Sequence, residues 1–316
     1  MSEKIFVVED DALTVKQLQQ HIEEMGYQFA GKADNAEVAL EQIRLTQPDL
    51  VLMDIRLEGA MDGIDAAAKL RADSTVAVIY LTAYAEDDLL ARAKLTEPFG
   101  YLLKPFTQKE LKASIEMGLY KSAMEHKQQR IFDAVVHTIT ELVKLHDPLI
   151  NGIQARAAEL AEAIAAELQL PAQEVKGIRL AAMLHGIGMV AISVDLLRRT
   201  PLQGAAKDYF QTHPEIAWRL LKDIEFPCPI AEMVYQHQER MDGSGYPRGL
   251  AGEAILPGAR VVAVACAMAT LLSPHGIEAG DSVADALKEL EASKGTLFDA
   301  NAVDACARVL RKKGST

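Results

Sequence analysis

Four short apolar runs in the first 120 residues, each leading into a charged or hydroxyl side chain, limit most strongly how this chain can fold. They are residues 4–8, 49–54, 76–82 and 101–104. Between them, apolar residues recur at helical spacing over residues 13–25, 36–45, 64–70 and 89–95. Apolar strands that alternate with helices are typical of βαβ units, in which helices cover both faces of a parallel sheet. We therefore predict a doubly wound α/β domain.

Acidic, hydroxyl and ammonium groups stand where these apolar runs end. The first run leads to Glu9 and Asp10, the second ends in Asp54, and the last two end in Thr82 and Lys104. The carboxyl ends of parallel strands meet in one crevice, where ligands bind. Clustered carboxylates repel one another and need a cation, and their hard oxygens suit Mg²⁺. Such a site, with a hydroxyl and an ammonium for phosphoryl oxygens, suits phosphoryl transfer onto a carboxylate.

Acids at strand ends also serve as turn formers and helix N-caps. We expect this simpler role for Asp11 and Asp62. The set spread over four strand ends is a less probable product of chance, and we predict that it forms a site.

The motifs VVEDD, LVLMDIRL, IYLTAY and GYLLKPF resemble the receiver domain of response regulators over residues 1–120. The resemblance implies a flavodoxin-like, five-stranded parallel sheet with Asp54 as the phosphoacceptor. It implies that Asp10, Asp54 and the backbone carbonyl of Arg56 hold Mg²⁺, supported by Glu9 through water. It further implies that Thr82 and Lys104 bind the phosphoryl group and that Tyr101 is the aromatic switch residue. No position departs from the family pattern, so we expect a competent receiver.

The second half of the chain is helical throughout and differs in charge. Residues 1–120 hold 21 acids and 12 bases, a net of −9, whereas residues 121–316 have a net of −3 and seven of the eight histidines. No strand signal is convincing, so we predict an all-α domain, with a receiver at 1–120, a helical linker at 121–145 and an output domain at 146–316. The expected helices are 107–145, as one helix or two, then 153–168, 172–184, 205–221, 230–239, 260–272, 282–292 and 301–311.

Three histidines in this half stand in motif-like surroundings. His185 ends an apolar helix in AAMLHGIGM, His213 precedes a proline that opens a helix, and His237 precedes a glycine-rich loop. A lone histidine is more often structural than a ligand. Three on helices that can converge are a moderate signal for a metal site.

The sequence DGSGYPRGL, with LHGIGM upstream, resembles the HD-GYP branch of the HD phosphohydrolases over roughly residues 145–310. The resemblance implies a helical hydrolase of cyclic di-GMP, in which two or three metal ions activate water. The loop residues that match are Arg240 on the substrate side and Asp242, Gly243, Gly245, Tyr246 and Pro247.

Five positions depart from the family's metal and phosphate ligands, and only His185, His213 and His237 match. Gly186 stands for the bridging aspartate, Met189 for a lysine, Gln238 for a histidine, Cys266 for an aspartate and Ile153, in the stretch 147–153, for another histidine. The remaining ligands lack the negative charge to hold two dications close together.

Three functions follow for the output domain. We favour a catalytically inactive domain that acts through protein–protein interaction. The first alternative is residual phosphodiesterase activity at a reduced site of the three histidines and Cys266, although Cys266 is more simply a small buried apolar residue. The second is a sensor that binds cyclic di-GMP through Arg240 without hydrolysing it. We accordingly expect Mg²⁺ in the receiver and no metal, or a weakly held one, in the output domain.

Composition and charge narrow the expected partners. The net charge of −12 and the lack of a basic recognition helix argue against DNA, and the apolar run 261–272 is too short for a membrane span. We expect no signal peptide, and three cysteines without a CxxC pair suit a reducing cytoplasm. We expect a sensor histidine kinase and a GGDEF-type diguanylate cyclase or another signalling protein as partners. The apolar stripe Leu111, Ile115 and Leu119 either pairs with a second copy, giving a homodimer, or packs on the receiver's own sheet.

Overall fold

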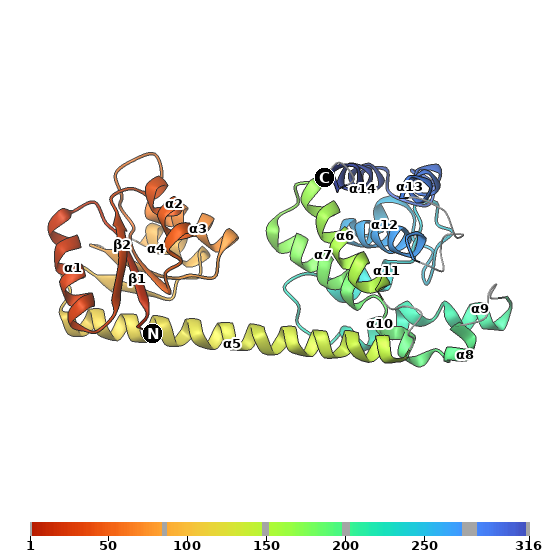
Figure 1. Cartoon of the computed structure of the whole chain (residues 1–316), viewed down its shortest axis with the longest axis horizontal. Helices are drawn as coiled ribbons and strands as arrows, with labels where there is room; N and C mark the ends of the chain where they lie inside the picture. Colours follow the sequence, from red (N-terminus) through yellow and green to blue (C-terminus); the bar gives the residue numbers. More distant parts are fainter. Residues whose placement is uncertain (1, 84–86, 147–151, 198–202, 274–282, 314–316) are drawn as a thin grey trace. The chain divides into compact units, whose positions relative to one another are not determined.

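The computed structural model describes residues 2–83, 87–146, 152–197, 203–273 and 283–313, so most of the stretch 147–153 and the start of the expected helix 282–292 lie outside it. The chain divides into two compact units, Met1–Phe132 and Asp133–Thr316. One continuous helix, α5 (Gln108–His146), contributes to both units (Figure 1). The expected segment 107–145 is thus one helix, and the predicted linker 121–145 lies within it.

The first unit is a five-stranded parallel sheet, as predicted, and its strands lie in the order β2-β1-β3-β4-β5. Its strands are β1 (Lys4–Val8), β2 (Gln28–Ala33), β3 (Leu50–Asp54), β4 (Ala77–Thr82) and β5 (Gly100–Leu103). Its helices besides α5 are α1 (Ala12–Glu24), α2 (Ala36–Thr46), α3 (Gly63–Asp73) and α4 (Asp87–Leu95). The side chains of Asp11 and Asp62 accept hydrogen bonds from backbone N–H groups of α1 and α3, which confirms both as N-caps.

Both faces of the sheet are buried, because side chains of each strand alternate between two apolar clusters. Ile5 and Val7 pack with α1 and α5, whereas Phe6 and Val8 pack with α2 and α3. Leu111 and Ile115 of α5 are fully buried in the first cluster, and Leu119 packs against it. The stripe therefore packs on its own sheet, the second of the two expected arrangements, and the homodimer stays a prediction without this stripe as its contact.

Strand β2, at one edge of the sheet, does not coincide with any of the four apolar runs in the sequence. Its sequence QFAGKA contains one large apolar residue, and its side chains are half-buried or exposed except for Ala33. Gly31 lies against the ring of Phe6, where a Cβ would come within 2.9 Å of Cε2, and the register shifts beside it. An edge strand is covered less than a central one, so its sequence carries a weaker apolar signal.

The second unit is helical, and its described residues form two isolated β-bridges but no strand. Its helices are the end of α5, α6 (Ile153–Glu167), α7 (Ala172–Leu184), α8 (Val194–Leu197), α9 (Ala205–Phe210), α10 (His213–Leu221), α11 (Ile230–Gln236), α12 (Pro257–Leu271), α13 (Val283–Ala292) and α14 (Ala300–Lys313), with 3₁₀ turns η2 (Ile187–Ala191) and η3 (Gly252–Ala254). The prediction of an all-α domain is confirmed.

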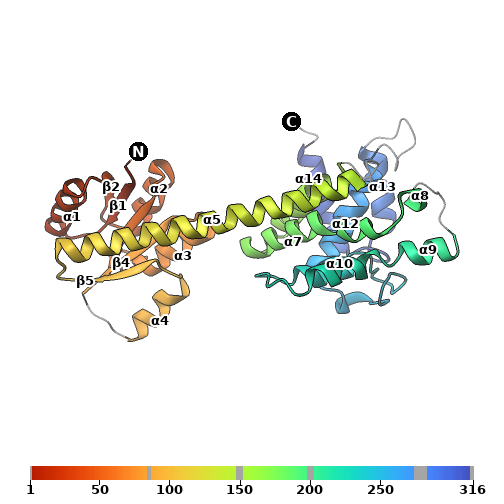
Figure 2. The same ribbon diagram turned by 90° about the horizontal axis from the view of Figure 1, so that it is seen from below.

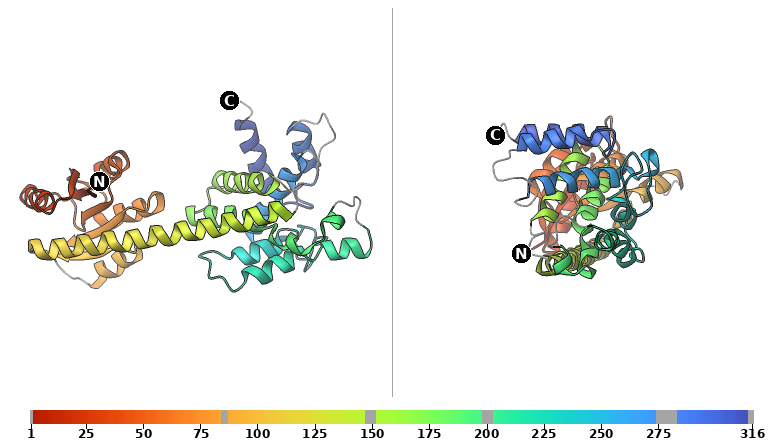
Figure 3. Two further views of the ribbon diagram at one scale, coloured as in Figure 1. Left: turned by 60° about the horizontal axis from the view of Figure 1, so that its bottom comes forward. Right: turned by 90° about the vertical axis from the view of Figure 1, so that its right-hand side faces the viewer.

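Helix α12 is the centre of this unit. It contacts α6, α7 and α11 on one side and α13 and α14 on the other (Figures 2 and 3). Its sequence is almost wholly apolar, and nine of its side chains are buried. A helix that is apolar all round is stable only when surrounded by other helices. None of the described helices combines the length and the hydropathy that crossing a membrane requires.

Two short features bring the histidine segments together. Pro214 occupies the first turn of α10, where its missing N–H costs nothing, so His213 opens the helix and the segment 205–221 becomes two helices. Gly188 of η2 lies against α10, and a Cβ there would come within 2.0 Å of the carbonyl oxygen of His213. The turn after His185 can therefore approach the start of α10 only with glycine at this position.

Candidate functional site

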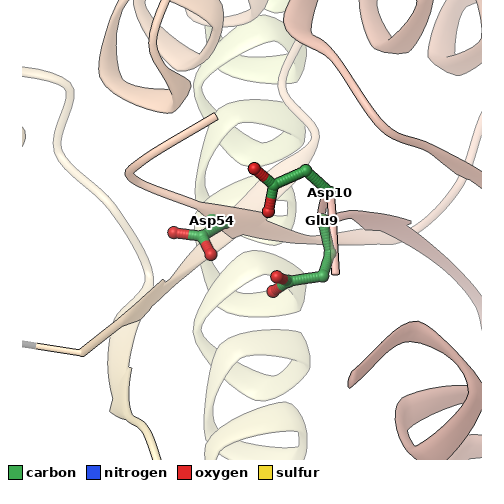
Figure 4. A group of neighbouring side chains, drawn as sticks. All are labelled: Glu9, Asp10 and Asp54. Atoms are coloured by element: carbon green, nitrogen blue, oxygen red, sulfur yellow. The ribbon is translucent and has the colours of Figure 1, made fainter. Parts of the chain in front are cut away.

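Three carboxylates meet at the carboxyl ends of β1 and β3. One oxygen from each of Glu9, Asp10 and Asp54 lies within 4.8 Å of the other two, and Figure 4 shows these carboxylates turned toward a common space. Glu9 and Asp54 are buried, whereas Asp10 is exposed. Oxygen ligands at these separations suit a small hard cation, so the residues present fit Mg²⁺.

Lys104 supplies the positive charge of this cluster. Its Nζ lies 2.5 Å from Oε2 of Glu9 and is also hydrogen-bonded to Oδ2 of Asp54. Burial raises the pKa of Glu9 to about 7, although the bond from Lys104 lowers it. Burial alone would lower the pKa of Lys104, but its bonds to Asp54 and Glu9 raise it above its ordinary value. When all three carboxylates are ionised, the single ammonium leaves the cluster with two surplus negative charges, the number that one dication neutralises.

The other predicted receiver residues surround this cluster. The backbone N–H of Arg56 donates to Oδ1 of Asp54 at 2.9 Å. Thr82 ends β4, is buried, and accepts through its carbonyl oxygen a 2.7 Å bond from the N–H of Lys104. The ring of Tyr101 lies 5.8 Å from that of Tyr80, and its buried hydroxyl has no hydrogen-bond partner among the described residues.

A cavity of about 540 Å³ occupies the second unit. His185, His213 and His237 line it, together with Cys266 and Arg240. The structure therefore brings together the family-like residues predicted from sequence. Tyr246 also lines it, as do three positions of departure from the family, Ile153, Met189 and Gln238.

The three histidines share one arrangement. Each Nδ1 lies 2.6–2.8 Å from a carbonyl oxygen three residues earlier, of Ala182, Phe210 and Val234 respectively. A carbonyl oxygen only accepts, so each Nδ1 carries the hydrogen and each Nε2 is left with a lone pair. Burial lowers the pKa of all three imidazoles, so they are neutral at pH 7.

The imidazole rings of His185 and His213 each lie 5.3 Å, centre to centre, from the ring of His237. The Nε2 atoms of His213 and His237 are 3.4 Å apart, but among the described residues no three His, Cys, Asp or Glu ligand atoms converge outside the receiver cluster. Burial raises the pKa of Cys266 to about 12, so its free side chain is a neutral thiol that only a bound metal ion would deprotonate. The three histidines and Cys266 thus line one cavity, together with the exposed Glu289, and the reduced metal site stays a prediction.

Sequence reasoning missed the residue that holds the glycine-rich loop. Glu239 is almost fully buried, and its carboxylate accepts hydrogen bonds from the N–H groups of Arg248 and Leu250 at 2.8 and 2.9 Å. Asp242 instead forms a turn with Ser244. Gly245 packs on the end of α11, where a Cβ would come within 2.4 Å of the N of Arg240. A charged residue two positions after His237, just before the glycine-rich loop, was the available signal for Glu239.

Acid is expected to destabilise the second unit through its buried neutral histidines. Burial lowers the pKa of His213 to about 4 from an ordinary value near 6.5. Between these pH values the unfolded chain binds more protons than the folded one, so the free energy of unfolding falls as pH falls, by about 3 kcal/mol for the full shift. Denaturation followed by fluorescence of Trp218, the chain's single tryptophan, should show a smaller loss between pH 7 and 5 in His213→Gln.

The matched control for this experiment is His126→Gln, because His126 is an exposed histidine of the first unit. This variant should keep the full loss of stability on acidification. Equal pH dependence in wild type and His213→Gln would contradict the assignment of a neutral buried imidazole.

Comparisons with known families match both halves of the chain. The response regulator receiver domain matches residues 5–116, and the HD domain matches residues 137–302. The two matches lie on either side of the middle of α5, where the chain divides into its two units.

Relatives with both halves are described as cyclic di-GMP phosphodiesterases. The chain is 30% identical to the cyclic di-GMP phosphodiesterase response regulator RpfG of Xanthomonas campestris, covering 96% of this chain and 86% of that protein. It is 26% identical to a cyclic di-GMP phosphodiesterase of Thermotoga maritima, covering 95% and 89%. Among solved structures, the receiver domain of a modulated diguanylate cyclase from Desulfovibrio desulfuricans is 37% identical over 40% of this chain and 99% of that one, with a TM-score of 0.38.

Proposed function

Because the chain belongs to the response regulators that carry a receiver domain followed by an HD-GYP-type domain, we propose that phosphorylation of Asp54 controls an output domain that has lost hydrolysis and acts by binding another protein. One contrast carries this proposal. The carboxylate cluster of the receiver is complete, whereas in the output domain no three ligand atoms converge among the described residues and glycine stands at the position of the family's bridging aspartate. On this proposal Asp54 can be phosphorylated, but phosphorylation does not lead to hydrolysis of cyclic di-GMP in the output domain.

In the receiver, Asp54 is the phosphoacceptor. One of its carboxylate oxygens attacks the phosphorus of a phosphohistidine on a sensor kinase, forming an acyl phosphate as the P–N bond breaks and the imidazole leaves with a proton. Glu9, Asp10, Asp54 and the carbonyl of Arg56 would hold Mg²⁺, which neutralises charge on the phosphoryl oxygens. Lys104 already pairs with Asp54, so its ammonium is placed to pair with a phosphoryl oxygen on that side chain.

Thr82 and Tyr101 complete the receiver's proposed response. Thr82 ends β4 next to the strand of the phosphoacceptor, so its hydroxyl is the candidate partner of the new phosphoryl group. The Tyr101 hydroxyl has no hydrogen-bond partner among the described residues. Rotation of the Tyr101 side chain would therefore break no hydrogen bond. These two residues provide a path from the phosphate to β5 and α5.

The output domain keeps the scaffold and the loop of its family while its catalytic groups are replaced. Glu239 holds the glycine-rich loop in place, so a shaped surface around Asp242, Gly243 and Pro247 persists without catalysis. We propose this loop as part of the surface that contacts a partner, and a GGDEF-type diguanylate cyclase stays the predicted partner. We further propose residues 121–145 as the segment that carries the receiver's signal, because they lie within one helix shared by both units.

The test of the output assignment is a hydrolysis assay on the full chain. Cyclic di-GMP incubated with Mn²⁺, Fe²⁺ or Zn²⁺ should be turned over no faster than by buffer with metal, with or without a phosphodonor. An active HD-GYP phosphodiesterase assayed in parallel is the positive control. Turnover that disappears in His185→Ala would overturn the proposal and favour residual activity at a reduced metal site.

A second candidate function, a sensor that binds cyclic di-GMP, is favoured by Arg240. Its guanidinium lines the cavity, is largely buried and lies 5.1 Å from the ring centre of Phe298. It donates to the carbonyl of Glu239 and to Oε1 of Gln238, and no carboxylate of the described residues lies within ion-pair distance. A buried cation without a counter-charge suits an anionic ligand. Calorimetric titration of the same samples would support this function if heat of binding is lost in Arg240→Ala, and would exclude it if wild type shows none.

A further inference from the structure

A glutamine of α6 occupies the space beside the position where the family's bridging aspartate has become glycine. A Cβ built on Gly186 would lie 2.0 Å from Nε2 of Gln154 and 3.1 Å from its Cδ. The backbone of Gly186 is in the right-handed helical region, with φ −86° and ψ −1°, so it does not itself need glycine. A side chain at position 186 would therefore have to displace the flexible end of Gln154, whereas the backbone of Gly186 would not oppose it.

The environment of Gln154 is unusual for an amide. The residue is 3% exposed, and among the described residues neither its Oε1 nor its Nε2 has a hydrogen-bond partner. Unpaired buried polar groups destabilise a fold, so an apolar side chain would be the simpler occupant of this space. Gln154 lies next to Ile153, which itself stands where the family has a metal-binding histidine.

The geometry points to Gln154 as the residue that keeps metal ions out of the output cavity, by filling the place that a carboxylate at position 186 would take. A carboxamide is neutral: its NH₂ group only donates hydrogen bonds, and its carbonyl oxygen can approach a cation but brings none of the negative charge that a bridging carboxylate supplies. The loss of the aspartate and the presence of Gln154 are thus one structural change in two parts. This inference rests on the proposed loss of hydrolysis, and it predicts that restoring the aspartate alone does not restore a metal site.

A double-mutant cycle on the full chain tests the steric part. Gly186→Ala should lower the thermal midpoint reported by Trp218 fluorescence by about 2–4 °C, because the buried end of Gln154 must leave its position. In the Gln154→Ala background the same change should shift the midpoint by less than about 2 °C, since the space is then open. Gln173→Ala, an exposed glutamine of α7, is the matched control and should leave the full decrease in place.

Metal uptake tests the chemical part. The receiver's own cation site is first removed by Asp10→Asn and Asp54→Asn in every sample. In this background, the otherwise wild-type chain and Gly186→Asp, dialysed against Mn²⁺ and then freed of unbound ion, should retain less than about a tenth of an equivalent per chain. The Gly186→Asp/Gln154→Ala variant should retain several times more, because an aspartate there joins His213 and His237, whose Nε2 atoms are already 3.4 Å apart. Circular dichroism of each variant confirms that it is folded.

Each outcome decides one point. Equal destabilisation by Gly186→Ala in both backgrounds would overturn the steric role of Gln154. Equal Mn²⁺ retention by Gly186→Asp with and without Gln154 would overturn its role in metal exclusion. Wild-type protein that retains an equivalent of Mn²⁺ and hydrolyses cyclic di-GMP would instead refute the proposed function, even if the cycle shows coupling between the two residues.

Discussion

Asp54→Asn is expected to abolish incorporation of phosphate into this protein. Wild type incubated with acetyl phosphate and Mg²⁺ should gain the mass of about one phosphoryl group per chain, and the variant should gain less than about a twentieth of that. The amide of asparagine is neutral and a poor nucleophile, and it removes one of the three carboxylates that converge at the end of β1 and β3. Intact-protein mass spectrometry measures the difference directly.

Asp49, a carboxylate at the amino end of the strand that Asp54 ends, provides the control. Asp49 precedes β3, is exposed, and accepts a bond from the backbone N–H of Lys4 at 2.7 Å. Asp49→Asn should incorporate phosphate like wild type, because it lies at the other end of the strand that Asp54 ends. Incorporation that persists in Asp54→Asn would place the phosphoacceptor elsewhere.

Gly63→Ala is expected to produce the second-largest effect, because it acts on the backbone of the phosphoacceptor. Gly63 opens α3, and a Cβ there would lie 1.9 Å from the carbonyl oxygen of Asp54 and 3.1 Å from Cγ of Met53. The end of β3 must therefore move by about 1 Å or more. We expect a loss of roughly 3 kcal/mol in stability and, since misplacement on this scale is severe for chemistry, phosphorylation that is about 100-fold slower.

Gly100→Ala is the matched control for this prediction. A Cβ at Gly100, the first residue of β5, would meet nothing closer than Cγ1 of Ile79 at 3.8 Å, an ordinary contact. Calorimetric unfolding and the rate of phosphorylation by acetyl phosphate should be close to wild type in this variant. If Gly63→Ala behaves like Gly100→Ala, the approach of α3 to Asp54 does not determine the geometry of the site.

Most of the receiver was predictable because its signals are local. The strands are buried on both faces, so their apolar runs are continuous, and the polar residues that follow mark the one edge where ligands bind. Glu9, Asp54 and Lys104 were found in this way and do lie together. The edge strand β2 escaped the pattern because burial on an edge requires fewer apolar residues.

The output domain was less predictable, because its decisive contacts join residues that are distant in sequence. The histidines were visible as motifs, but whether their nitrogens converge depends on how α7, α10 and α11 pack. Glu239 looks like an ordinary surface acid in the sequence, yet it is buried and holds the glycine-rich loop. Gln154 carried no signal at all, because its meaning depends on a glycine 32 positions away.

The sequence by itself determined the two fold classes, the carboxylate cluster and the departures from the HD-GYP ligand pattern, since each follows from residue types in a local order. Only the tertiary structure decided what those departures mean. A missing aspartate leaves open whether its place becomes a void or is filled by a neighbour. Side chains fill protein interiors almost completely, so a lost group is normally replaced by another side chain, and here that side chain is Gln154 of a different helix.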